Sequence, residues 1–461
     1  MKKTRIICTM GPACRELSIL EKMMIEGMDV ARLNFSHGSH DEHKKAIETI
    51  RTASRNVGKP VAILADLQGP KIRTGKLEDK NKPLVLKKGD ILTITIEEYL
   101  GKDKKIGTDY KEFPKDVKPG NTVLFADGAL ISKVVAVREK EVDLEMLNDG
   151  ELGSHKGINL PGVKVSSPAL SDKDIEDLVF ALQNDVDYVA LSFVRKPEDI
   201  MKCKQIIYKN GKNTPVIAKI EKDEALEKID KILEVADGIM VARGDLGVEM
   251  ELEKVPFIQK MLIHKCNMVG KPVIVATQML ESMITAPRPT RAEASDIVNA
   301  ILDGTDCIML SGETAVSVDP VNSVRTMATI AKEADMRAMQ SGTFIERAIR
   351  TKFSMPSSVA HAACKLAEEL FAEAIVAFTE SGTTARFVSK YRPRTPIIAC
   401  TPHDSTLRTM AMFWGVKGIK VEWNEDFEEA AGDGACKAGR YSCIHHGRTF
   451  RPRPYQPYQS T

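Results

Sequence analysis

The sequence predicts a (β/α)8 barrel that is interrupted by a small β domain and followed by a separate α/β domain. Eight short apolar, β-branched runs are typical of buried strands. Amphipathic stretches alternate with them, as strand–helix units require. Polar side chains follow the later runs, at the end where barrels of parallel strands carry their chemistry. An open doubly wound sheet is the second interpretation, but no Gly-x-Gly-x-x-Gly turn favours it.

The barrel is expected to occupy residues 1–73 and 168–345. Ser171 with Asp174, and Thr290 with Glu293, predict capping boxes at the starts of two helices, and Gly304 predicts the end of the second. The expected strands are residues 4–9, 29–34, 61–67, 187–193, 215–218, 238–241, 272–276 and 307–310.

Residues 74–167 predict a small β domain inserted between the third strand and its helix. Strand signals lie at 84–86, 91–96, 122–125, 130–137 and 142–146, and turns such as Asp127-Gly128 separate them. Because the insertion follows the C-terminal end of a strand, it stands over the face where chemistry is expected. We therefore expect it to act as a lid.

Residues 346–431 predict an α/β domain with helices at 359–369 and 385–391 and strands at 374–378 and 396–401. A hydroxyl-rich loop precedes its second helix, and either ordinary helix capping or phosphate binding explains this loop. Its candidate phosphate ligands are Thr379, Ser381, Thr383 and Thr384.

Residues 432–461 show no apolar period and are rich in Arg, Pro, Tyr and Gln, so the sequence predicts a disordered tail. Cys436, Cys443, His445 and His446 suggest a metal site, but their spacing matches no zinc pattern.

Composition indicates a cytoplasmic enzyme. The chain has 461 residues and a formal net charge of +2, which favours neither nucleic acid nor a membrane surface as a partner. No apolar run is long enough to span a bilayer. The nine cysteines are scattered and are expected to be buried thiols instead of a disulfide framework.

The barrel mouth predicts a metal-assisted phosphoryl-transfer site. Glu221 and Asp245 follow adjacent strands and offer hard oxygen ligands for Mg²⁺ or Mn²⁺, unless they only pair with Lys219 and Arg243. Lys219 alternates to the same strand face as Glu221, where an ammonium suits the charge of a phosphoryl group. Backbone N–H groups at Gly244 are suited to a substrate carboxylate.

At these residues the chain resembles the pyruvate kinase family. The resemblance is carried by residues 31–38, 69–75, 217–221, 239–247, 276–283 and 308–314, and it runs from about residue 4 to about residue 429. It implies phosphoryl transfer from phosphoenolpyruvate to ADP, giving pyruvate and ATP in the final step of glycolysis. It also implies a homotetramer and a sugar-phosphate or nucleotide effector, while the oligomeric state of this chain stays open.

The resemblance also implies a role for each residue. Glu221 and Asp245 hold the divalent cation, and Lys219 and Arg32 act on the phosphoryl group. Gly244, Asp245 and Thr277 bind the substrate carboxylate, and Thr277 and Ser311 border the proton route. Glu313 is interpreted as structural, and His37 as either structural or nucleotide-binding. The nucleotide residues implied are Arg73, Lys156, Asp127, Asn34 and His37.

Two departures from the family pattern matter. Leu67, Gln68 and Lys71 stand where most members have threonine, lysine and glutamate. In those members the threonine is a potassium ligand, and the glutamate supports that site. This change predicts that the Lys71 ammonium, surrounded by Asn34, Ser36 and Asp66, removes the need for potassium. The unpatterned tail replaces the usual end of the C-terminal domain, which predicts an incomplete domain and a weakened effector site.

Two other functions remain as alternatives. The first is another phosphoenolpyruvate or pyruvate-enolate barrel enzyme, such as an aldolase or a phosphohistidine-using synthase. The inserted domain and the position of Lys219 beside the metal pair argue against it. The second is an inactive product of the aberrant C-terminus.

Overall fold

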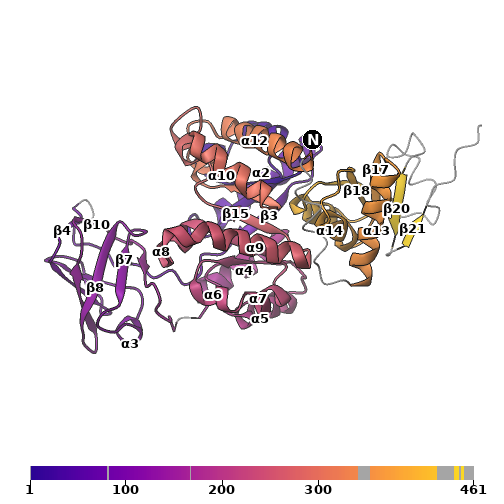
Figure 1. The fold of residues 1–461 in the computed structure, drawn as a ribbon. Helices are drawn as coiled ribbons and strands as arrows, with labels where there is room; N and C mark the ends of the chain where they lie inside the picture. The colour runs from indigo at the N-terminus through magenta and orange to yellow at the C-terminus, as the bar shows by residue number, and fades with distance from the viewer. Residues whose placement is uncertain are drawn as a thin grey trace, which may run out of the picture.

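The computed structural model describes residues 2–79, 82–166, 168–340, 354–422, 441–445 and 448–450. A central barrel carries a β domain on one side and an α/β domain on the other (Figure 1). No helix in these ranges is both long and apolar enough to cross a membrane.

The predicted barrel is confirmed. Its strands close in the order β1-β16-β15-β14-β13-β12-β3-β2, and every neighbouring pair is parallel. Their bounds are β1 (Arg5–Thr9), β2 (Val30–Asn34), β3 (Ala62–Asp66), β12 (Tyr188–Leu191), β13 (Val216–Ile220), β14 (Gly238–Ala242), β15 (Val273–Ala276) and β16 (Cys307–Leu310).

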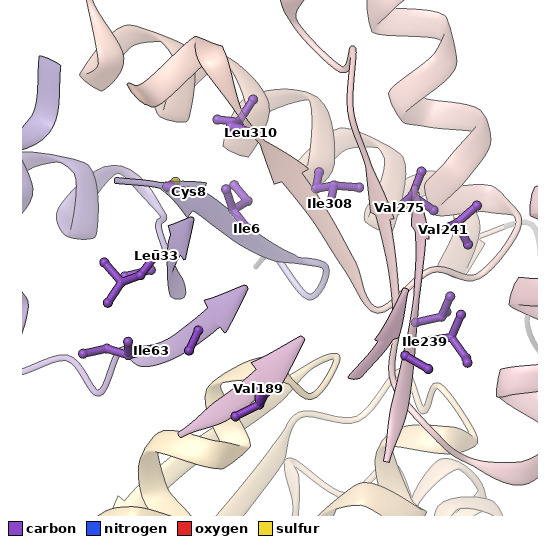
Figure 2. Packing of buried hydrophobic residues seen from close by; sticks show 14 of the residues in the cluster. Ile6, Cys8, Leu33, Ile63, Val189, Ile239, Val241, Val275, Ile308 and Leu310 are labelled. Carbon is purple, nitrogen blue, oxygen red and sulfur yellow. The ribbon is translucent and has the colours of Figure 1, made fainter. Parts of the chain in front are cut away.

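Alternation along each strand divides the apolar side chains between two cores. Ile6 and Cys8 of β1 point outward and pack with the surrounding helices, in a cluster that includes Ile239 and Ile308 (Figure 2). Ile7 points into the barrel, where it packs in the second cluster. Both faces of the strands are therefore buried, which explains their continuous apolar sequence.

Two of the outer helices begin where the sequence predicts. Ser171 and Asp174 form a reciprocal capping box, as do Thr290 and Glu293. The Asp174 carboxylate also accepts a hydrogen bond from the Gly69 N–H at 2.9 Å, so this cap holds the segment that leads to the lid. The main outer helices are α1 (Leu17–Glu26), α2 (His40–Val57), α4 (Asp172–Gln183), α5 (Pro197–Lys209), α7 (Ile229–Val235), α9 (Val255–Val269), α10 (Arg291–Leu302) and α12 (Pro320–Gln340).

The inserted domain contains a six-stranded sheet, β11-β7-β8-β9-β5-β6, and a two-stranded sheet, β10-β4. The five predicted strands are present. Strands β6, β10 and β11 were missed because each is only two or three residues long and, unlike Leu84–Leu86, is not an apolar run. Bounds are β4 (Leu84–Leu86), β5 (Ile91–Thr95), β6 (Lys105–Gly107), α3 (Phe113–Asp116), β7 (Thr122–Phe125), β8 (Leu130–Val137), β9 (Glu141–Met146), β10 (Gly150–Leu152) and β11 (Ile158–Asn159).

The C-terminal domain has a five-stranded sheet in the order β19-β18-β17-β20-β21. Its predicted elements are present, and α15 and β19 extend it further along the chain. The bounds are α13 (Met355–Glu369), β17 (Ala374–Phe378), α14 (Thr383–Lys390), β18 (Ile397–Thr401), α15 (Asp404–Thr409), β19 (Val416–Lys420), β20 (Tyr441–His445) and β21 (Arg448–Phe450).

The prediction that residues 432–461 form a disordered tail is wrong for β20 and β21. Strand β20 runs parallel to β17, and β21 pairs with β20 in the antiparallel sense. The backbone groups on the open edge of β17 need partners, and a segment of unremarkable composition can provide them. The domain boundary at residue 431 therefore moves to at least Phe450. Cys436 and His446, from the suggested metal site, lie outside the described residues.

Polar contacts join the C-terminal domain to the barrel. The Arg408 Nε donates to the buried Asp187 carboxylate at 2.7 Å, and Asp187 also accepts from the Arg51 guanidinium at 2.8 Å. The Tyr188 hydroxyl donates to the Thr409 carbonyl at 2.7 Å. Since Asp187 and Tyr188 lie at the N-terminal end of β12, the domain contacts the barrel opposite the active-site mouth.

Candidate active site

Lys219 lies at the centre of the charged groups in the barrel mouth. Its Nζ lies 3.1 Å from Asp66 Oδ1 and 3.0 Å from Glu221 Oε1, and it donates to the Ser192 hydroxyl at 2.6 Å. Burial alone lowers the pKa of Lys219, but the two carboxylates outweigh burial and raise the pKa well above its usual value. The amine therefore stays protonated and presents a fixed positive charge.

Arg32 supplies a second cation to the same mouth. Its Nε donates to Asp66 Oδ2 at 2.6 Å, and its Nη1 donates to the Thr9 hydroxyl at 3.0 Å. Burial raises the pKa of Asp66, but the charges of Lys219 and Arg32 lower it by more than burial raises it. The net shift is downward, and the carboxylate is ionised. Asp66 thus fixes two cations, because its Oδ2 accepts from Arg32 and its Oδ1 lies 3.1 Å from the Lys219 ammonium.

Glu221 and Asp245 form a carboxylate pair that fits a divalent cation. Glu221 Oε2 accepts from the Phe193 N–H at 2.7 Å. Burial raises the pKa of Glu221, Lys219 lowers it, and the charge of Asp245 raises it again, so the net shift is upward. A bound cation would relieve this repulsion between carboxylates.

The described residues contain no group of three or more His, Cys, Asp or Glu side chains that could enclose a metal. A divalent cation held by these two carboxylates would keep coordination positions for water and substrate oxygens, which is how proteins commonly hold Mg²⁺.

The turn after β15 holds a strained threonine against the start of α8 (Arg243–Glu249). The Gly244 N–H donates to the Thr277 hydroxyl at 2.9 Å, and Arg243 donates to the Thr277 carbonyl at 2.6 Å. Thr277 has φ +70° and Gln278 has φ +54°. A left-handed conformation of this kind costs about 1–3 kcal/mol per residue and recurs at functional sites, where surrounding contacts enforce it.

Glu313 has the structural role predicted for it. It is fully buried in α11 (Gly312–Ala315), and its carboxylate accepts from the N–H groups of Leu280 at 3.0 Å and of Ser311 at 2.6 Å. It therefore fixes Ser311 and the segment after Thr277 relative to each other.

Lys71 does not lie where the sequence predicted. Its Nζ is 3.4 Å from Asp127 of the lid and 4.0 Å from the metal-site Asp245, instead of lying among Asn34, Ser36 and Asp66. The lysine stem packs beneath the lid, where a Cβ added at Gly157 would lie 3.0 Å from Lys71 Cε. The ammonium consequently links Asp127 of the inserted domain to Asp245 of the barrel.

Asn34 and Ser36 are satisfied locally. The Ser36 N–H donates to the Asn34 side-chain oxygen at 3.1 Å. Asp66 is likewise occupied by Arg32 and Lys219. The prediction that these three residues surround the Lys71 ammonium is therefore wrong in geometry, because it depended on where the lid docks.

The predicted nucleotide residues lie in two places. Arg73 and Lys156 meet at the base of the lid, where Arg73 Nη1 is 3.4 Å from the His155 carbonyl and the Lys156 N–H donates to the Thr74 hydroxyl at 2.8 Å. Asn34 and His37 instead line a cavity of about 610 Å³ beside Thr9 and α2. This volume is ample for a small-molecule group.

Ser192 and Thr9 were missed by the sequence analysis, although each lies at the end of a predicted strand. They accept hydrogen bonds from Lys219 and Arg32, respectively. Their position at strand ends was the available signal, because that edge of a barrel collects functional side chains.

In the C-terminal loop, the Thr379 hydroxyl accepts from the Gly382 N–H at 2.9 Å, which is a capping role within the turn. Ser381 Oγ and Thr383 Oγ1 lie 2.9 Å apart at the surface, just before and at the start of α14, and Thr384 follows them.

A buried ammonium between carboxylates, beside an open carboxylate pair under a β lid, defines a phosphoryl-transferring barrel enzyme. Residues 1–324 match the family model for the pyruvate kinase barrel domain, and residues 357–449 match the model for the pyruvate kinase alpha/beta domain. The chain belongs to the pyruvate kinase family.

Individual relatives agree over most of the chain. A pyruvate kinase from Clostridium acetobutylicum is 46% identical, covering 95% of this chain and 93% of its own. One from Staphylococcus aureus is 46% identical, covering 91% of this chain and 72% of its own. The crystal structure of a pyruvate kinase from Cryptosporidium parvum has a TM-score of 0.89 at 40% identity, covering 96% of this chain and 94% of that one.

Proposed function

We propose that this chain transfers the phosphoryl group of phosphoenolpyruvate to ADP, and that the group lies between the cations Lys219 and Arg32 during the transfer. The bond between phosphorus and the enol oxygen breaks, a terminal oxygen of ADP bonds to phosphorus, and the released enolate takes a proton on its methylene carbon to give pyruvate. The observation that carries this proposal is the Lys219 ammonium, held 3.0–3.1 Å from two carboxylates and kept protonated by them.

Glu221 and Asp245 would hold the divalent cation, which supplies Lewis-acid stabilisation of phosphoryl and enol oxygens when bound. Lys219 contributes a positive charge that needs no rearrangement as negative charge develops on the phosphoryl oxygens. Arg32, fixed by Asp66 and Thr9, orients the phosphoryl group. Lys71, 4.0 Å from Asp245, adds a positive charge at the lid side of the mouth.

The strained Thr277 turn suits the carboxylate end of the substrate. The N–H groups of Gly244 and Asp245 open α8, and the Thr277 hydroxyl lies against Gly244. Thr277 and Ser311 border the route by which a proton reaches the enolate carbon. Glu313 fixes this region, because its carboxylate accepts from the N–H groups of Ser311 and Leu280.

We place the two parts of ADP in different regions. Arg73 and Lys156 at the lid base would contact its phosphates directly. Asp127 is an anion, so it would act on a phosphate only through a cation between them, either the bound metal or the Lys71 ammonium. The cavity lined by Asn34 and His37 would receive the adenosine portion. Both regions border the mouth that contains Arg32 and Lys219.

The remaining expectations concern the effector, the oligomeric state and the cellular location. We propose that Ser381, Thr383 and Thr384, with Thr379 shaping their turn, bind an effector phosphate, and that the chain assembles as a homotetramer in the cytoplasm. Size-exclusion chromatography with light scattering, with and without a phosphorylated effector, measures the assembly directly.

A lactate-dehydrogenase-coupled assay with phosphoenolpyruvate, ADP and Mg²⁺ tests the function. We expect pyruvate formation that depends on ADP and ceases when the metal is chelated. Pyruvate formation that needs AMP and phosphate instead of ADP would favour a phosphohistidine-using synthase. Absence of any turnover would favour the alternative that the chain is an inactive protein.

Potassium should not be required. Since the tethered Lys71 ammonium supplies positive charge beside Asp127 and Asp245, turnover in tetramethylammonium buffer should change little when potassium is added. Lys71→Glu should lower turnover strongly because it brings a third carboxylate to Asp127 and Asp245. Leu67→Thr combined with Lys71→Glu should regain part of the activity when potassium is added. A tenfold rise in the turnover of the unmodified chain when potassium is added would contradict this prediction, since it corresponds to about 1.4 kcal/mol of transition-state stabilisation.

A further inference from the structure

Glu249 is a buried carboxylate that joins the inserted domain to the barrel and that the proposed mechanism does not use. Its Oε1 accepts hydrogen bonds from the Asn159 amide at 3.0 Å and from the Lys222 ammonium at 2.9 Å. The three side chains come from three elements: Asn159 from β11 of the inserted domain, Lys222 from the segment after β13, and Glu249 from the end of α8. We call these three residues the Glu249 cluster, and Figure 1 shows α8 on the side of the barrel that faces the inserted domain.

The cluster is shielded from solvent and is too closely packed to hold a substrate. Glu249 is 6% exposed and Asn159 is 5% exposed, and the side chain of Lys222 is 13% exposed. The cavity beside them has a volume of about 30 Å³, which admits water and nothing larger. The cluster is therefore a contact between parts of the protein.

Asn159 is an unfavourable choice for stability alone. Its Oδ1 has no hydrogen-bond partner among the described residues, and burial of an unpaired amide oxygen costs free energy. An apolar side chain of similar volume would fill the same space without that cost. The amide is explained instead by its hydrogen bond to Glu249, which fixes where the inserted domain lies.

Two members of the cluster are adjacent to the metal carboxylates. Glu249 lies one helical turn after Asp245 on α8, so the two side chains share a face of this helix. Lys222 directly follows Glu221 after β13. The buried ion pair between Lys222 and Glu249 therefore links the two segments that carry the proposed metal ligands, and removing one partner would leave the other uncompensated.

The third member connects the cluster to the proposed nucleotide-binding groups of the inserted domain. Asn159 lies three residues after Lys156. Its strand β11 pairs with β7, which ends at Phe125, two residues before Asp127. The hydrogen bond from Asn159 to Glu249 therefore sets where Lys156 and Asp127 lie relative to the barrel.

We propose that Glu249 is a positioning residue for the phosphoryl transfer. Through Lys222 it fixes the relative positions of Glu221 and Asp245. Through Asn159 it fixes the inserted domain above the barrel mouth. Glu249 acts through these partners and not through contact with the substrate. Its effect on turnover rests on the proposed function, whereas its effect on metal binding is measurable without catalysis.

Mn²⁺ binding by the full chain without substrates tests the link to the metal carboxylates, and electron paramagnetic resonance of free Mn²⁺ measures it. Lys222→Met should raise the dissociation constant of Mn²⁺ about tenfold, as loss of a group that orients metal ligands commonly does. Loss of a nearby cation would by itself tighten Mn²⁺ binding, so weakened binding reports lost positioning. Lys222→Arg keeps a cation for Glu249 and should bind Mn²⁺ like the unmodified chain.

Steady-state kinetics test the link to the inserted domain. Asn159→Leu removes both the hydrogen bond to Glu249 and the unpaired amide oxygen. It should raise the KM for ADP about tenfold, while the dissociation constant of Mn²⁺ and the melting temperature stay unchanged. Lys140→Met is the control for both tests, because it removes an exposed ion pair with Glu97 on the inserted domain and should change neither quantity.

Mn²⁺ binding by Lys222→Met that equals or exceeds that of the unmodified chain would overturn the proposal, as would an unchanged KM for ADP in Asn159→Leu. Glu249→Ala should show both defects, and the two partner variants decide the proposal if this variant does not fold. A lowered melting temperature with neither defect would assign the cluster to stability alone and would also overturn it. If the unmodified chain binds Mn²⁺ but forms no ATP, the proposed function fails, and the Mn²⁺ titration still decides the positioning role.

Discussion

Lys219→Met should lower kcat about 10²-fold or more, with a much smaller effect on the binding of phosphoenolpyruvate. The substitution removes the ammonium that lies between Asp66 and Glu221, and this charge matters most when negative charge develops on the transferring phosphoryl group. Steady-state kinetics with varied phosphoenolpyruvate, together with a direct binding titration, separate the two effects.

Lys209→Met is the matched control, because it removes an exposed lysine far from the mouth and should retain full turnover. Circular dichroism should show that the Lys219→Met chain is folded. Turnover of Lys219→Met within threefold of the unmodified chain would remove this residue from the mechanism.

The pH dependence of turnover gives an independent check on Lys219. Because Asp66 and Glu221 outweigh burial and raise its pKa above the ordinary value of 10.5, the ammonium is retained as pH rises through that value. Any alkaline limb of the turnover profile that lies below pH 10.5 should therefore persist in Lys219→Met. Its disappearance in that variant would show that Lys219 titrates in the neutral-to-alkaline range.

Ending the chain after Glu422 should destabilise the C-terminal domain. This deletion removes β20, which pairs with β17 over five residues from Ala374 to Phe378. At about 1 kcal/mol for each hydrogen bond, the domain should lose about 3–5 kcal/mol of stability. Its thermal transition should fall by roughly 12 °C or more, because 1 kcal/mol shifts the transition of a domain of this size by about 4–8 °C.

A chain that ends after Phe450 is the control, since it keeps both β20 and β21 and should melt like the full chain. Differential scanning calorimetry of the three lengths measures the effect. Equal transition temperatures for the chains ending at Glu422 and Phe450 would show that the β17–β20 pairing contributes no stability.

The barrel could be predicted from the sequence because its signals are local and repeated. Each strand is buried on both faces and is therefore apolar throughout, and each functional side chain follows such a run. Lys219, Glu221, Asp245 and Thr277 could be proposed as site residues on this basis, and Glu313 is buried.

The incorrect predictions concern features that depend on tertiary contacts. The position of the Lys71 ammonium depends on how the lid packs above it, and no local pattern encodes this docking. Strand β20 owes its conformation to the open edge of β17, which lies more than sixty residues earlier in the chain.

Phosphorus NMR of one reaction mixture tests the central claim most directly, because it follows the phosphoryl group itself. With phosphoenolpyruvate, ADP and Mg²⁺, the phosphoenolpyruvate signal should fall as the γ-phosphate signal of ATP rises in equal amount, and without ADP neither should change. Inorganic phosphate appearing in place of ATP would show hydrolysis. Consumption of phosphoenolpyruvate without ADP would contradict transfer of its phosphoryl group to ADP.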